Sequence, residues 1–251
     1  MKRSDVTKLP SMPLSSPSYG LPPFQFVNRE YLIISYVSDP ELIRAAVPEP
    51  LEPDGSNTIL YEFIKMPDSD KGFGDYTETG VVIPCLYEGE PVNYTAQMYL
   101  DCDPPIVGGR EIWGFPKKLG CPHLSVIQDT LTGTLEYAGQ SIVLGTMAYK
   151  QECLSDTEDK RKALTQKMSK TQVNLKMIPG VSGGYDVLQL VAYNLQNIQL
   201  KGGWRGAARL HLVPHVNAPV ADLPVRYVVD GLHLIADLEL PSGRILFDYL
   251  K

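Results

Sequence analysis

The sequence has no long hydrophobic run. No apolar stretch approaches the roughly 20 residues that a helix needs to cross a bilayer. The segment Met1–Val6 carries two basic side chains but no apolar stretch follows it, so it lacks the pattern of a secretory signal. We therefore expect no membrane partner and a cytoplasmic location.

Cysteine and histidine are scarce, with four of each among 251 residues. The histidines form no metal-site grouping beyond His211 and His215, which Pro214 separates. The cysteines form no C-x-x-C pair, which is typical of reduced thiols in a cytoplasmic protein; they are Cys85, Cys102, Cys121 and Cys153. We expect no disulfide framework and no metal.

Basic residues are outnumbered by acidic ones. The chain has 23 Lys and Arg against 29 Asp and Glu, a net charge of −6 with a pI near 5.3. A nucleic-acid partner would call for a basic surface, so this balance argues against one. It also argues mildly against binding to an anionic membrane.

Alternating apolar and polar residues dominate the rest of the chain. The run Tyr193–Leu200 has the period of two that is typical of a strand with one buried face. Many such runs and few helical patterns predict an α+β protein that is mainly antiparallel β. We expect a single domain over residues 1–251, built on a closed or cone-like β-barrel with a few peripheral helices. Residues 1–23, rich in Pro and Ser from residue 8, are expected to form an extended N-terminal arm.

Local signals predict individual elements. Asp39–Val47 has a capping residue, a proline in the first turn and a following Pro48, which predicts a helix. A second helix is expected from about Asp156 to Ser169, with Ser155 and Glu158 in the spacing of a capping box. Val187–Leu200 is expected as one strand, and Ala138-Gly139 as a hairpin turn.

Two adjacent lysines, Lys117 and Lys118, follow an apolar segment that contains Trp113 and Phe115. A lysine acts as a nucleophile only as a neutral amine, and its ordinary pKa of about 10.4 leaves almost none neutral at pH 7. Burial among apolar groups and a second positive charge nearby both lower a lysine pKa. The pair is therefore the leading candidate for chemistry, against the alternative of a solvated surface pair.

Simple magnitudes show which effect would lower the lysine pKa more, burial or the charge of the neighbouring lysine. Lowering a lysine pKa to about 7 requires about 4.6 kcal/mol. A second ammonium about 6 Å away supplies about 2.8 kcal/mol at an effective dielectric of about 20, but only about 0.4 kcal/mol at about 10 Å through water. Adjacent side chains of an extended segment point to opposite faces. We therefore expect burial to be the larger cause and the charge of Lys118 the smaller.

The segment Gly109-Arg110-Glu111-Ile112-Trp113-Gly114-Phe115-Pro116-Lys117-Lys118-Leu119 resembles the active-site stretch of the acetoacetate decarboxylase family. Activated lysine nucleophiles of this kind are exemplified by that family. Other segments resemble it in the same order along essentially the whole chain; they are Phe26–Tyr31, Tyr76–Gly80, Met98–Asp101, Asp129–Leu135 and Asp248–Lys251.

The resemblance implies roles for individual residues. It makes Lys117 the Schiff-base nucleophile and Lys118 the neighbour implicated in lowering its pKa. Arg29 and Glu78 match polar active-site residues of the family, and Glu62 matches a second acidic one. Phe115, Trp113 and Met98 are expected to line the substrate pocket. Taken without the resemblance, Arg29 would be a structural ion-pair partner, Glu78 a loop carboxylate and Glu62 a solvent-facing strand residue.

The implied function is decarboxylation of a small β-keto acid, acetoacetate to acetone and carbon dioxide, without metal or organic cofactor. The resemblance also implies a homo-oligomer, a dodecamer. One alternative is a Schiff-base aldolase or dehydratase of the same superfamily. Another is a non-catalytic β-barrel that binds a small keto ligand.

Overall fold

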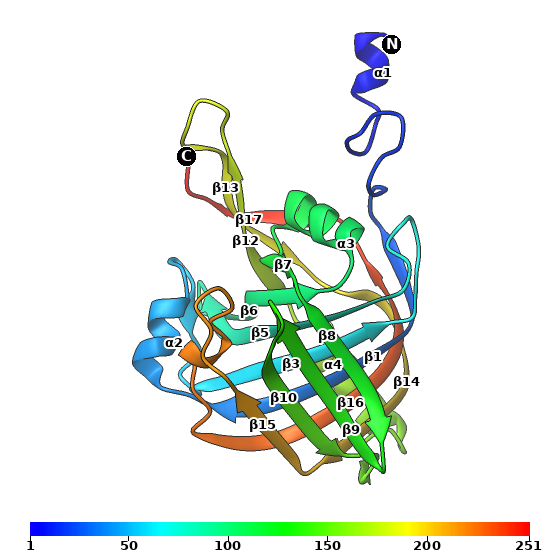
Figure 1. The fold of residues 1–251 in the computed structure, drawn as a ribbon, viewed down its shortest axis with the longest axis vertical. Coiled ribbons are helices and arrows are strands. Elements are labelled where there is room, and N and C mark those ends of the chain that lie inside the picture. The colour runs from blue at the N-terminus through cyan, green and yellow to red at the C-terminus, as the bar shows by residue number, and fades with distance from the viewer.

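The computed structural model describes residues 1–251. Strands predominate and the helices are short (Figure 1). The helical elements are α1 (Arg3–Val6), α2 (Pro40–Ala46), α3 (Asp103–Gly108), the π-helix Gly109–Trp113, α4 (Glu158–Met168) and the 3-10 turn Val220–Asp222. The strands are β1 (Phe24–Val37), β2 (Glu52–Pro53), β3 (Thr58–Met66), β4 (Asp68–Ser69), β5 (Tyr76–Tyr87), β6 (Glu90–Leu100), β7 (Lys117–Leu119), β8 (Cys121–Ile127), β9 (Thr130–Tyr137), β10 (Gln140–Ala148), β11 (Glu152–Cys153), β12 (Gln172–Pro179), β13 (Tyr185–Tyr193), β14 (Gln196–Gly206), β15 (Ala208–Leu212), β16 (Tyr227–Leu240) and β17 (Arg244–Asp248).

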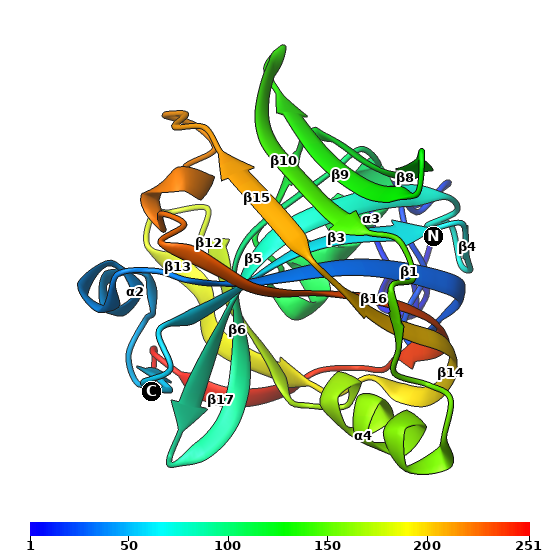
Figure 2. The same ribbon diagram turned by 90° about the horizontal axis from the view of Figure 1, so that it is seen from below.

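A large, strongly curved sheet forms the body (Figure 2). Its strand order is β11-β14-β16-β1-β3-β5-β6-β12-β13-β17, with β2, β4 and β7 paired at its margins. Most pairs are antiparallel, as expected, but β6 runs parallel to both β7 and β12. The order begins at β11 and ends at β17, so the expectation of a closed barrel is not confirmed. Alternation predicts the buried face of each strand but does not show whether the two outer strands meet.

A second sheet of four strands, in the order β15-β10-β9-β8, packs across the first. Phe63 of β3 is fully buried at this contact. A methyl group on Gly133 of β9 would lie 2.3 Å from Phe63 Cγ, and one on Gly145 of β10 would lie 2.5 Å from its Cε2. Both glycines therefore make room for the ring. The larger hydrophobic cluster, of 28 buried residues, includes Phe63 and side chains of β8, β9 and β10.

The two predicted helices are present with different caps. In α2, Asp39 is the N-cap, but its carboxylate binds Arg226, with Nε 2.8 Å from Oδ1. In α4 the capping residue is Thr157, whose hydroxyl accepts from the backbone amide of Lys160. The predicted capping box of Ser155 and Glu158 is therefore wrong. Ser155 is buried and its hydroxyl accepts the backbone N–H of Gly203 at 3.1 Å.

One predicted strand is interrupted in the structure. The expected strand Val187–Leu200 is two strands, β13 and β14, separated at Asn194 and Leu195. The Asn194 side chain donates to the carbonyl of Ser169 and to the hydroxyl of Thr171, which holds the break. The predicted turn at Ala138-Gly139 is confirmed, since it joins β9 to β10 with φ values of 51° and 76°.

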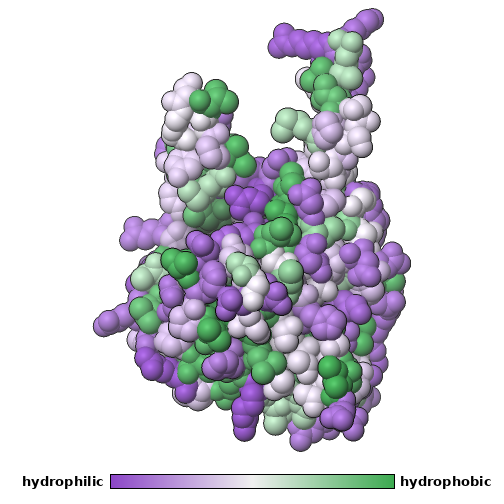
Figure 3. Space-filling view, in the orientation of Figure 1, coloured by the Kyte–Doolittle hydropathy of each residue, from purple (hydrophilic) through white to green (hydrophobic).

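Residues 1–23 form an arm that projects from the body and carries α1 at its N-terminal end (Figure 1). The hairpin of β12 and β13 forms a second projection, and the surface is hollowed between the two (Figure 3). Exposed apolar side chains occur on both projections, among them Met12 and Leu14 on the first and Val181 and Tyr185 on the second. None of the helices has the length and apolarity that a membrane crossing would require.

Candidate active site

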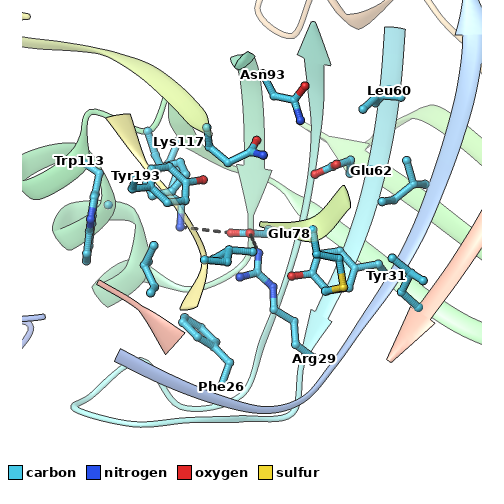
Figure 4. Close-up of a pocket in the computed structure, with 18 of the residues that line it drawn as sticks. Phe26, Arg29, Tyr31, Leu60, Glu62, Glu78, Asn93, Trp113, Lys117 and Tyr193 are labelled. Carbon is cyan, nitrogen blue, oxygen red and sulfur yellow. Dashed lines mark hydrogen bonds and ion pairs between the residues drawn. The ribbon is translucent and has the colours of Figure 1, made fainter. Parts of the chain in front are cut away.

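A cavity lies against the concave face of the large sheet and holds the predicted nucleophile (Figure 4). It encloses about 100 Å³ of free space, which suits a small substrate. The second hydrophobic cluster, of 20 buried residues, surrounds it. The apolar lining residues include Phe26, Ile33, Leu60, Phe73, Leu232, Leu234 and Leu240.

The side chains of Lys117 and Lys118, on strand β7, point in opposite directions. The strand pairs in parallel with β6, so that Lys117 lies beside Met98 and Lys118 beside Tyr99. Lys117 lines the cavity and its side chain is 5% exposed. Lys118 is exposed; its Nζ lies 5.2 Å from the centre of the Tyr137 ring and donates to the carbonyl of Asn217. Lys118 is therefore not brought to the predicted catalytic position.

Glu78 lies between two cations (Figure 4). Its Oε1 is 3.2 Å from Arg29 Nη2, and its Oε2 is 3.2 Å from Lys117 Nζ. All three side chains are buried, and they come from β1, β5 and β7. Arg29 and Lys117 are 88 residues apart in the sequence, and Glu78 lies between them. The fold brings the three side chains together, as the resemblance implied.

Burial is the main cause that lowers the pKa of Lys117 below its ordinary value. The negative charge of Glu78 opposes this shift, and the positive charge of Arg29 adds to it. Lys118 is not among the causes. The cation that faces Lys117 across Glu78 is therefore Arg29, and the lysine that follows in the sequence has no such contact.

Glu62 also lines the cavity, from β3. Burial raises the pKa of its carboxyl to about 7, the charge of Arg29 opposes the shift and the charge of Glu78 adds to it. A carboxyl group with this pKa exchanges a proton near neutral pH. The position of Glu62 in the cavity agrees with the prediction from the sequence.

Three tyrosines of the cavity were not predicted from the sequence. Tyr31 and Tyr76 each lie two residues from a predicted site residue, Arg29 and Glu78, on the same strand. Because side chains two apart in a strand share a face, the period of two could have identified both. Tyr193, at the end of β13, carries no such signal. Asn93, Gln172 and Lys167 also line the cavity and were not predicted.

Trp113 and Phe115 form an aromatic wall beside Lys117, as predicted. Their ring centres are 6.1 Å apart, and Phe115 lies 5.3 Å from Tyr193. The Lys117 ammonium is 4.9 Å from the centre of the Phe115 ring. Met98 is buried in the cluster around the cavity but does not line it, so the prediction that it forms part of the pocket wall is not confirmed.

A glycine leaves room for the lysine side chain. Gly109 begins the π-helix Gly109–Trp113 and lines the cavity. A methyl group there would lie 2.8 Å from Lys117 Cδ and 3.3 Å from its Nζ. The π-helix ends at Trp113 and is followed by Gly114, whose φ of 76° lies in the left-handed region.

The arrangement suits imine chemistry. No three His, Cys, Asp or Glu side chains lie close enough together to hold a metal ion. A buried amine with a lowered pKa can attack a ketone, and the neighbouring guanidinium can bind a carboxylate.

The chain matches a known family and its members over nearly its whole length. The family model described as "Acetoacetate decarboxylase (ADC)" matches residues 11–250. An acetoacetate decarboxylase of Paraburkholderia xenovorans (strain LB400) is 53% identical over 240 residues, which cover 96% of this chain and 92% of that protein.

Two solved structures are similar over nearly all of the chain. One, of an acetoacetate decarboxylase, superposes with a TM-score of 0.95 at 37% identity and covers 100% of both chains. Another, of the acetoacetate decarboxylase of Legionella pneumophila subsp. pneumophila str. Philadelphia 1, has a TM-score of 0.89 at 42% identity and covers 96% of this chain and 95% of that one. The chain belongs to the acetoacetate decarboxylase family.

Proposed function

We propose that this protein decarboxylates acetoacetate to acetone and carbon dioxide through an imine on Lys117. The family membership supports the reaction, since the relatives bear the name acetoacetate decarboxylase. The observation that carries the mechanism is the buried amine of Lys117, 3.2 Å from Glu78 in an apolar cavity. The proposed enzyme is a carboxy-lyase without a cofactor.

The reaction begins with the neutral amine of Lys117. It attacks the ketone carbon, and loss of water gives a protonated imine. The carbon–carboxylate bond then breaks and its electron pair forms a new carbon–carbon double bond, while the π pair of the C=N bond moves onto nitrogen. Carbon dioxide departs and an enamine remains. A proton adds to the enamine carbon, and hydrolysis releases acetone and the free amine.

Arg29 and Tyr31 are proposed to receive the substrate carboxylate. Arg29 Nε and the Tyr31 hydroxyl are buried and have no hydrogen-bond partner in the protein. Both residues line the cavity, and the Arg29 guanidinium carbon lies 4.9 Å from the centre of the Tyr31 ring. The adjacent charge of Glu78 and the apolar walls disfavour the carboxylate and so favour its loss as neutral carbon dioxide.

Glu62 is proposed as the acid that protonates the enamine carbon. Its carboxyl lines the same cavity, and its pKa of about 7 leaves a large fraction protonated at neutral pH. Water could also supply the proton, but the apolar lining limits its access. The proton returns to Glu62 from solvent between turnovers.

Borohydride reduction in the presence of acetoacetate tests the proposal. The expected result is a reduced adduct on Lys117, found by peptide mass spectrometry, together with release of carbon dioxide from the unreduced reaction. An adduct without carbon dioxide release would instead support the aldolase or dehydratase alternative. Absence of any adduct would exclude both enzymes and leave the non-catalytic binding protein.

We also propose a homo-oligomer, a dodecamer, of one-domain subunits over residues 1–251 in the cytoplasm. The exposed apolar side chains of the two projections support self-association, and the four free cysteines support a reducing compartment. Sedimentation equilibrium measures the oligomer directly: about twelve times the 27.8 kDa subunit mass is expected, and a monomer would contradict it.

A further inference from the structure

One residue of the N-terminal arm is buried although its neighbours are exposed. Tyr19 is 6% exposed, whereas residues 12–17 are all exposed. The hydroxyl of Ser11 donates to the carbonyl of Tyr19 at 3.1 Å and accepts its backbone N–H at 3.3 Å. Gly20 N donates to the carbonyl of Lys71 at 3.3 Å. The arm is therefore closed on itself between Ser11 and Tyr19 and joined to the body at Tyr19 and Gly20.

Tyr19 contacts the helical segment that precedes the reactive lysine. Its hydroxyl donates to Oε2 of Glu111, in the π-helix. Its ring lies against Gly108, where a methyl group would be 3.0 Å from Tyr19 Cγ and 3.3 Å from Phe73 Cε1. Phe73 lines the cavity and stacks on Phe24, with ring centres 4.2 Å apart.

The π-helix is held at almost every residue. Arg110 Nη1 donates to the carbonyl of Lys117 at 3.1 Å, and Lys176 Nζ donates to the carbonyl of Ile112 at 3.2 Å. Asn174 donates to the carbonyl of Trp113 at 3.3 Å. The carboxylate of Glu111 is held by a single side-chain hydrogen bond, the one from Tyr19. π-helical turns are rare and occur most often at functional sites.

We propose that Tyr19 and Glu111 form a clamp that holds the π-helix against Lys117. Tyr19 is a positioning residue: it acts through Glu111 and Gly109 and touches no reacting atom. The flat face of Gly109 against the Lys117 methylenes excludes water from the amine only while the π-helix stays in place. The N-terminal arm thereby takes part in keeping Lys117 desolvated.

Loosening the clamp admits water to the amine. Desolvation is the main cause of the lowered Lys117 pKa, so hydration raises that pKa toward its ordinary value. The charged or titratable groups that act on the lysine come from other elements and are unchanged; they are Glu78, Arg29 and Cys102. A shift in the Lys117 pKa therefore reports the packing of the π-helix.

The test measures that pKa without turnover. Carbamylation by cyanate proceeds through the neutral amine, so its rate at Lys117, followed by peptide mass spectrometry across pH, gives the pKa directly. The variants are Tyr19→Phe, Glu111→Gln and the double variant. Tyr185→Phe and Glu90→Gln are matched controls at exposed positions with no side-chain partner.

The expected result is a rise of the Lys117 pKa by about half a unit or more in each single variant, with no change in either control. The double variant should shift no further than the single ones, because the two groups act through one contact. An unchanged pKa in both single variants, or additive shifts in the double variant, would overturn the clamp. The inference concerns the lysine that the proposed function uses, but a protein inactive on acetoacetate would still show or lack this shift.

Discussion

Two lysines that are adjacent in the sequence occupy different environments. Lys117 Nζ is enclosed with Glu78 and Arg29, whereas Lys118 Nζ lies outside the cavity above the Tyr137 ring. The sequence predicted burial as the larger cause of the pKa shift, and the direction and order of causes at Lys117 agree. The cation that contributes to the shift, however, is Arg29, which no spacing in the sequence could indicate.

Removing each ammonium should therefore have unequal effects. Lys117→Met should lower kcat more than about 1,000-fold, because the proposed nucleophile is lost. Lys118→Met should lower it only a few-fold and cost at most about 1 kcal/mol of unfolding free energy, since an exposed contact is lost. Steady-state kinetics and urea unfolding measure both. Equal losses of kcat in the two variants would show that the Lys118 charge acts on the cavity.

The carboxyl of Glu62 gives a prediction for pH dependence. With a pKa of about 7 it donates a proton well below that pH and poorly above it, so kcat should fall as pH rises through the neutral range. Glu62→Gln should lower kcat about 100-fold and abolish this alkaline limb. The limb that reports deprotonation of Lys117 should remain. A retained alkaline limb in Glu62→Gln would assign it to another group.

At the scale of elements, the local sequence predicted a chain rich in strands with few helices but missed the helical segment beside the site. Asp103–Trp113 contains paired prolines and paired glycines, which ordinarily mark loops. Instead the prolines occupy the first turn of α3, and the glycines fit against Tyr19 and Lys117. These tertiary contacts override the local signal, because close approach at Gly108 and Gly109 requires the absence of a side chain.

The close approach at Gly109 can be tested directly. Gly109→Ala would bring a methyl group within 2.8 Å of Lys117 Cδ, so the lysine must move and kcat should fall at least about 10-fold. Gly139→Ala is the control: with φ of 76° in an open turn it should cost about 1 kcal/mol of stability without changing kcat. Steady-state kinetics and urea unfolding separate the two effects. Normal kcat in Gly109→Ala would mean that the π-helix yields instead.

At the scale of the whole molecule, the Phe63 ring fills the contact between the two sheets. Phe63 lies between β3 and the glycines of β9 and β10. Phe63→Ala should lower the free energy of unfolding by about 3–5 kcal/mol, because the cavity left between the sheets cannot collapse fully. Urea unfolding followed by circular dichroism measures the change. A loss below about 1 kcal/mol would show that the sheets are held mainly elsewhere.

The overall architecture was predictable only in part. Alternation predicted a mainly antiparallel protein with few helices, and the resemblance carried along the chain predicted the family. The alternation could not predict that the large sheet is open, since strand order depends on pairings between distant segments such as β11 with β14 and β13 with β17. Arg29, Glu62, Glu78 and Lys117 were identified from the resemblance, whereas Tyr193 and Lys167 reach the cavity only through tertiary packing.

The short strand β7 has a consequence for sequence change. Lys117 faces the cavity and Lys118 the outer face, so a shift by one residue would exchange the two lysines. Deletion of Pro116 would carry Lys118 toward the cavity and Lys117 toward solvent. The protein would then still present a buried primary amine at the same place, supplied by a different residue. Which lysine faces the cavity is thus decided by the number of residues that precede it in the segment before β7.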